Sequence, residues 1–130
     1  MGVSLALDHL TILSRDPALA QRFYGVVLPL LGFQQKNAKV WSNQNGLFVQ
    51  FGEARPDTAD YGRYAPGLNH FGFAAPDRET VLEVHKALLA EDIECRLQEL
   101  GMGTLALFIP DPDGLRVELA YYPPGVDPVS

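Results

Sequence analysis

The sequence predicts an α+β fold built from two β-α-β-β-β halves. The first observation behind this prediction is an internal repeat: residues 7–16 read LDHLTILSRD and residues 68–77 read LNHFGFAAPD. A leucine, a histidine and an aspartate recur in these stretches at the same offset. The second observation is that apolar residues alternate in both stretches, which is the period of a half-buried strand.

A helix is expected directly after the first strand. Asp16 is a good N-cap, and Pro17 suits the first helical position. Proline lacks a backbone donor and crowds the preceding turn, so Pro29 predicts that this helix ends near Leu28.

The remainder of the first half reads as strands. KVWSN (39–43) and LFVQFG (47–52) predict a hairpin, with Asn45-Gly46 as its turn signal. A weaker strand is expected near residues 33–36.

The second half repeats this order. Asp77 predicts a second helix cap, and the helix that follows is amphipathic. Its expected apolar stripe comprises Val81, Leu82, Leu88 and Leu89. Three strands follow, at residues 94–100, 104–109 and 115–122, separated by glycine-containing and PDPDG turns.

These elements predict a single domain over residues 1–130. We expect module 1 at about 5–53, a linker or flap at 54–66, module 2 at about 67–123 and a tail at 124–130. The loop 53–67 is long for a compact domain, which favours a linker or a flap over a site.

The composition limits the classes of partner. The hydrophobic fraction of 47% is ordinary for a globular protein, and the net charge is -6. An acidic chain without a basic cluster argues against nucleic acid and anionic membrane partners, and neither a signal peptide nor a membrane span is expected. Cys95 is the only cysteine, so no internal disulfide can form, and a cytoplasmic setting is expected. Cys95 itself reads as a small apolar filler rather than a nucleophile.

Strand alternation places several polar residues on one face of the sheet. Leu10 and Ile12 oppose His9 in the first strand, and the same parity puts His70, Glu118 and Gln50 on the face away from the helices. A carboxylate on an inner face is costly if it is unpaired. Two neutral imidazoles and one carboxylate can instead share a divalent cation and leave positions open for water or substrate.

A structural interpretation of the same residues is also available. A strand histidine is more often packed or hydrogen-bonded than metal-bound, and Glu118 could pair with Arg116 or Arg96. The recurrence of histidine at equivalent repeat positions favours the metal interpretation for His9, His70 and Glu118.

The chain resembles the vicinal oxygen chelate superfamily, the glyoxalase, bleomycin resistance protein and extradiol dioxygenase group. The resemblance rests on LDHLTI, DPALAQRFY…LGF, LNHFGFAAPD and DPDGLRVELAYY. It implies paired βαβββ modules in a cupped mixed sheet, often as a homodimer. It also matches His9, His70 and Glu118 to the family's metal ligands, with Zn, Fe(II), Mn, Ni or Co as the divalent ion.

The resemblance implies an enzyme whose small substrate chelates the metal through two adjacent oxygens. Gln50 falls where glyoxalase I-like members often carry a glutamate, and an amide cannot act as a general base; whether Gln50 is a fourth ligand stays open. Tyr122 has the parity of a proton donor in the cleft. The alternatives are a bleomycin-resistance-type binding protein without catalysis and a fosfomycin-type thiol transferase.

Overall fold

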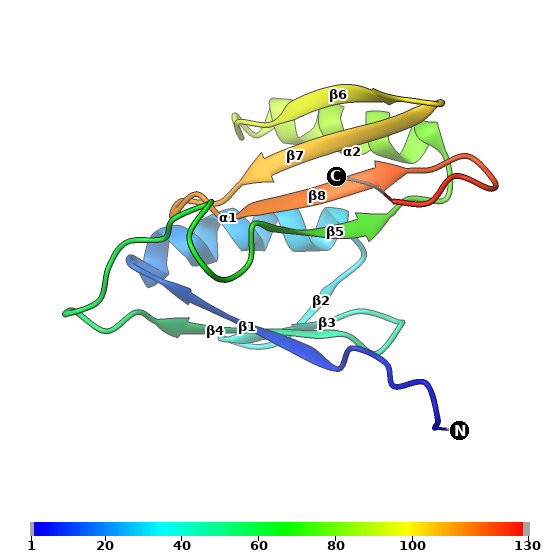
Figure 1. Cartoon of the computed structure of the whole chain (residues 1–130). Helices are drawn as coiled ribbons and strands as arrows, with labels where there is room; N and C mark the ends of the chain where they lie inside the picture. The colour runs from blue at the N-terminus through cyan, green and yellow to red at the C-terminus, as the bar shows by residue number, and fades with distance from the viewer. Residues whose placement is uncertain (1, 129–130) are drawn as a thin grey trace. The chain divides into compact units, whose positions relative to one another are not determined.

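The computed structural model describes residues 2–128. Met1 and the last two residues of the predicted tail, 129 and 130, lie outside the described part. The elements follow the order β1 (His9–Ser14), α1 (Pro17–Leu30), β2 (Gln34–Asn37), β3 (Val40–Ser42), β4 (Phe48–Glu53), β5 (His70–Ala74), α2 (Arg78–Ala90), β6 (Arg96–Gly101), β7 (Thr104–Pro110) and β8 (Arg116–Tyr121) (Figure 1).

The chain forms two compact units, Met1–Thr58 and Ala59–Ser130. Each unit contains one helix and one four-stranded mixed sheet, with strand orders β1-β4-β3-β2 and β5-β8-β7-β6. The first strand of each sheet pairs in parallel with the last strand of its unit, and the other pairs are antiparallel. The predicted α+β class with two βαβββ modules is therefore confirmed.

The two parallel pairs share one register. In unit 1 Thr11 lies opposite Gln50, and in unit 2 Gly72 lies opposite Glu118. Glu118 and Gln50 are therefore structurally equivalent positions.

The first helix is capped as predicted but is longer than predicted. The Asp16 side chain accepts hydrogen bonds from the backbone N–H groups of Ala18 and Leu19, and Pro17 occupies the first turn. The helix continues through Pro29 to Leu30, so the expected end near Leu28 is wrong. In the last turn a proline removes only one helical hydrogen bond, and the following N–H groups still bond back to helix carbonyls.

The second helix buries a different stripe from the one predicted. Asp77 caps it by accepting from Thr80, but Leu82 and Leu89 are exposed. The buried residues are Val81, Val84 and Leu88. They follow the i, i+3, i+7 spacing of one helix face, which packs on β7 and β8 (Figure 1).

The PDPDG turn fixes where β8 begins. The Asp111 carboxylate, almost fully buried, accepts hydrogen bonds from the backbone N–H groups of Asp113 and Leu115. Gly114 has a φ of 98°, a conformation that glycine adopts readily. This turn sets the register of β8 and thereby the position of Glu118.

No helix within residues 2–128 is long and apolar enough to cross a membrane.

We expect Leu107→Ala to destabilise the protein by about 2–5 kcal/mol, because Leu107 is fully buried in the central strand β7 and truncation leaves a cavity. Urea unfolding of the two proteins checks this. Leu82→Ala, on the exposed side of α2, is the matched control and should cost only about 0.5 kcal/mol. Equal losses for the two variants would contradict the assignment of the core.

Candidate functional site

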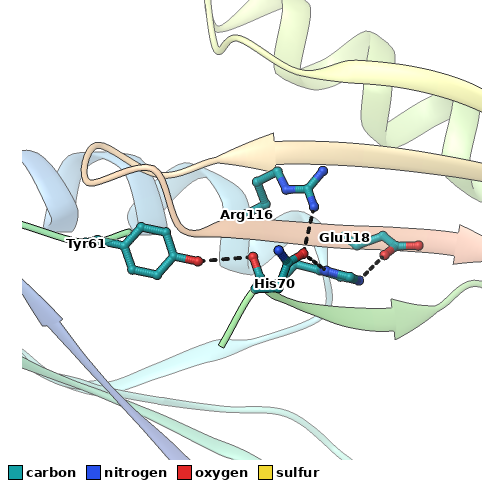
Figure 2. Close-up of polar contacts among 5 residues, drawn as sticks. Tyr61, His70, Arg116 and Glu118 are labelled. Atoms are coloured by element: carbon teal, nitrogen blue, oxygen red, sulfur yellow. Dashed lines mark hydrogen bonds and ion pairs between the residues drawn. The ribbon is translucent and has the colours of Figure 1, made fainter. Parts of the chain in front are cut away.

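An ion pair between neighbouring strands forms the centre of the candidate site. His70 on β5 and Glu118 on β8 contact through Nε2 and Oε1 at 3.0 Å (Figure 2). The Glu118 side chain is only 5% exposed and that of His70 is 19% exposed. Two of the three predicted metal ligands are therefore brought together, and Glu118 pairs with His70 rather than with Arg116 or Arg96.

Side-chain alternation explains this meeting. Val117 and Leu119 flank Glu118 in β8 and point to the helix-covered core, so Glu118 points to the opposite face. Gly72 lies opposite Glu118 on β5 and adds no side chain above its carboxylate. On the other side of Glu118, Phe108 of β7 packs edge-on against the His70 ring.

A cavity of about 270 Å³ opens on this ion pair. Its lining comprises His70, Gly72, Phe73, Ala74, Glu118, Tyr122 and Pro128. The cavity is large enough for several water molecules or a small ligand. Its walls offer one imidazole, one carboxylate and one phenol as polar groups.

Tyr122 is in the cavity wall, as its predicted cleft parity requires. Burial, and then the negative charge of Glu118, raise the pKa of its phenol. A raised pKa makes the phenol a weaker acid, so at neutral pH its O–H is a hydrogen-bond donor.

A second set of polar contacts orients His70 through Nδ1, the ring nitrogen that does not face Glu118. The Asn69 side-chain oxygen lies 2.7 Å from His70 Nδ1 and accepts a hydrogen bond from Arg116 Nη2 at 3.0 Å (Figure 2). Neither Asn69 nor Arg116 was among the predicted site residues. The signal for Asn69 was visible in the repeat, because a residue with a side-chain acceptor precedes the histidine in both LDH and LNH.

The corresponding positions of unit 1 are occupied differently. His9 stands at the start of β1, and its side chain is 52% exposed and contacts Asp8. Gln50 occupies on β4 the position that Glu118 occupies on β8. The convergence of His9 with His70 and Glu118 on one cation stays a prediction.

Neither unit gathers a complete metal site by itself. Within residues 2–128, no three His, Cys, Asp or Glu side chains of one unit form a cluster that could hold a metal ion. The donor types of the His70–Glu118 pair nevertheless suit a divalent first-row cation, because imidazole nitrogen and carboxylate oxygen both ligate such ions.

The long loop 53–67 divides between the units. In unit 1 the Arg15 guanidinium donates to the carbonyls of Arg55 and Thr58. In unit 2 the Tyr61 hydroxyl contacts the carbonyl of Asn69 at 3.1 Å (Figure 2) and that of Leu68 at 2.6 Å, directly before the site. A flap function for the loop stays a prediction.

Cys95 lies away from this site, directly before β6. Burial, and then the neighbouring Glu94 carboxylate, raise the pKa of its thiol. A protonated thiol is a poor nucleophile, which agrees with the predicted role of Cys95 as a filler.

The sequence profile of the Glyoxalase/Bleomycin resistance protein/Dioxygenase superfamily matches residues 6–119. A curated relative, the uncharacterized protein YqjT of Bacillus subtilis (strain 168), is 26% identical over 125 residues, which span 87% of this chain and 96% of YqjT.

Solved structures share the fold. A glyoxylase/bleomycin resistance protein/dioxygenase domain from Frankia sp. EAN1pec superposes with a TM-score of 0.73 at 17% identity, covering 93% of this chain and all of that one (100%). A lactoylglutathione lyase from Agrobacterium tumefaciens superposes with a TM-score of 0.66 at 22% identity, covering 89% of this chain and 92% of that one.

We expect the Tyr122 phenol to ionise at a higher pH than an ordinary tyrosine. Because its folded pKa is raised, the stability that the phenol contributes is complete below about pH 10, the unfolded value, and is lost as the pH rises through the folded pKa. Ultraviolet titration of tyrosinate in the wild type and in Tyr122→Phe measures this. The prediction would be contradicted if the substitution removed a tyrosine that titrates at or below about pH 10, rather than above it.

Proposed function

Because the chain belongs to the Glyoxalase/Bleomycin resistance protein/Dioxygenase superfamily, we propose that it is a metal-dependent enzyme acting on a small oxygenated molecule. His9, His70 and Glu118 would hold a divalent cation, and the substrate would bind through two adjacent oxygens. The observation that carries this proposal is the buried His70–Glu118 pair in the wall of a cavity.

The burial of Glu118 supports a role beyond folding. Burying a carboxylate costs several kcal/mol, and even a well-formed ion pair barely offsets this cost. For stability alone, apolar residues in place of Glu118 and His70 would serve equally well. A buried carboxylate next to an imidazole that opens on a cavity is the arrangement expected of a ligand pair. Buried ionisable groups that face a cleft are therefore candidates for a functional site.

His9 is the third ligand in this proposal. It occupies in unit 1 the strand position that His70 occupies in unit 2, since His9 lies opposite Phe48 as His70 lies opposite Arg116. Its ring is half exposed and is available to a ligand. The ligand set is completed either within one chain or with a second copy, and we propose a homodimer as the functional form.

The bound cation would act as a Lewis acid that stabilises negative charge on the substrate oxygens. Two-His-one-carboxylate sets accept Zn, Fe(II), Mn, Ni or Co. The chain's own contributions would be to position the cation, to line the cavity with the apolar Phe73, and to present the protonated Tyr122 phenol as a hydrogen-bond donor.

Proton transfer of the lactoylglutathione lyase kind is disfavoured. Gln50 stands at the position equivalent to Glu118, and an amide cannot accept a proton from a substrate. Glu53 does not substitute for it, because β4 pairs regularly with β1 through Gly52 and Glu53 without a bulge. Glu53 therefore has the parity of Phe51, on the face opposite Gln50.

The competing proposal is a binding protein of the bleomycin-resistance type, and a fosfomycin-type thiol transferase is the second alternative. A binding protein does not need a buried carboxylate beside a histidine. The single cysteine and the absence of basic clusters fit a cytoplasmic protein with a small-molecule ligand.

Metal analysis of the purified protein tests the proposal. We expect about one divalent ion per chain, and a free energy of unfolding that rises by about 2.7 kcal/mol when Zn²⁺ is added at one hundred times its dissociation constant. His9→Ala, His70→Ala and Glu118→Gln should each abolish most of this gain.

His85→Ala is the control, because His85 lies on α2 and outside the proposed ligand set. If no Zn²⁺, Mn²⁺, Ni²⁺ or Fe²⁺ binds and none raises the melting temperature, the binding-protein alternative replaces the enzyme.

A further inference from the structure

Both proposed histidine ligands contact the side chain of the residue immediately before them. Asp8 Oδ2 lies 2.7 Å from His9 Nδ1, and Asn69 Oδ1 lies 2.7 Å from His70 Nδ1. The two contacts occur at equivalent positions of the repeat and use chemically different acceptors. A chance contact would have no reason to recur in this way.

The backbone allows these contacts at the point where each strand begins. Successive residues of a regular strand point to opposite faces, so their side chains do not ordinarily meet. Asp8 and Asn69 each stand just outside the strand, because β1 begins at His9 and β5 begins at His70. The acceptor can therefore turn back onto the histidine that follows it.

The contacts in unit 2 place a hydrogen on Nδ1 of His70. The Asn69 amide is fixed at both ends: its oxygen accepts from Arg116 Nη2 at 3.0 Å, and its nitrogen donates to the carbonyl of Arg63 at 2.9 Å. An amide oxygen can only accept, so the partner nitrogen, His70 Nδ1, must carry a hydrogen. Nε2 is the nitrogen that faces the Glu118 carboxylate at 3.0 Å, and a cation bound by both groups would replace the hydrogen of this contact.

The same logic applies in unit 1. An ionised carboxylate only accepts, so Asp8 requires a hydrogen on His9 Nδ1 and leaves Nε2 as the free nitrogen. A ligating histidine commonly donates its other N–H to such an acceptor, which fixes the orientation of the ring and raises its basicity as a ligand.

We propose that Asp8 and Asn69 are positioning residues that present the Nε2 atoms of His9 and His70 to one cation. This inference rests on the proposed function and adds two residues, with Arg116 and Arg63 as supports for Asn69, that lie outside the ligand set. It also gives part of the long loop a role, because the Arg63 carbonyl orients Asn69 and the Tyr61 hydroxyl bonds to the Leu68 carbonyl.

The test uses the full chain labelled with ¹⁵N at histidine and loaded with Zn²⁺. The ¹⁵N chemical shifts distinguish metal-bound, protonated and free imidazole nitrogens, and competition with a chelator gives the affinity. We expect Nε2 of His9 and His70 to be metal-bound and Nδ1 of both to be protonated. His85, preceded by the apolar Val84, is the internal control and should not change on loading.

Paired variants separate the loss of the hydrogen-bond acceptor from any effect on folding. Asp8→Leu and Asn69→Leu remove the acceptor and should weaken Zn²⁺ binding by about 10- to 100-fold. Asp8→Asn keeps an acceptor oxygen and should bind within a few-fold of the wild type. Asn69→Asp keeps the oxygen but loses the donation to the Arg63 carbonyl, so it should lose less affinity than Asn69→Leu. Circular dichroism and melting temperature confirm that each variant folds, and the exposed Asp8 gives a variant with little effect on packing.

The outcomes separate this inference from the function on which it rests. If the wild type binds no metal ion, both fall. If Zn²⁺ binds through Nδ1, or if the leucine variants bind as tightly as their acceptor-keeping partners, the positioning role is wrong while the metal-dependent function stands. Affinity lost in the leucine variants and better kept in the paired ones supports the inference.

Discussion

The cost of burying the Glu118 carboxylate constrains the rest of this site. Strand β8 is buried along most of its length, so its one acidic residue needs a partner on the same face. His70 is the partner, and the parallel pairing of β5 with β8 is what brings the imidazole within 3.0 Å. The Asp111 turn that starts β8 is thus as important for the site as His70 and Glu118 themselves, because a shift of one residue would point Glu118 into the apolar core.

The two halves show how one backbone plan can hold different chemistry. At the position where unit 2 carries a buried carboxylate, unit 1 carries the neutral amide of Gln50. Before its histidine, unit 2 carries the amide Asn69, whereas unit 1 carries the carboxylate Asp8. The negative charge therefore contacts Nε2 in one half and Nδ1 in the other, which would make the two histidines unequal as ligands.

The surroundings of Asn69 illustrate how supporting residues would matter for the proposed metal site. A histidine ring can bind through either nitrogen, and its choice depends on what the other nitrogen meets. Arg116 reaches Asn69 from β8 and also lies over the Phe108 ring, so strand pairing, aromatic packing and the orientation of one amide are connected. In the proposed site, such connections would hold His70 in place before a cation binds.

Much of this protein follows from its sequence because strand and helix periods are local properties. The repeat of LDH and LNH, the helix caps at Asp16 and Asp77 and the parity of Glu118 all depend on neighbours a few residues away. The sequence by itself therefore determined the βαβββ order, and it predicts the face that each candidate ligand occupies. Its errors at Pro29 and at the stripe of α2 arose where local rules compete with packing, since only contact with β7 and β8 selects which leucines are covered. Tertiary structure alone decided that Glu118 meets His70 and that Arg116 holds Asn69 across 47 residues of chain, because hydrogen-bond partners depend on which strands pair and in what register.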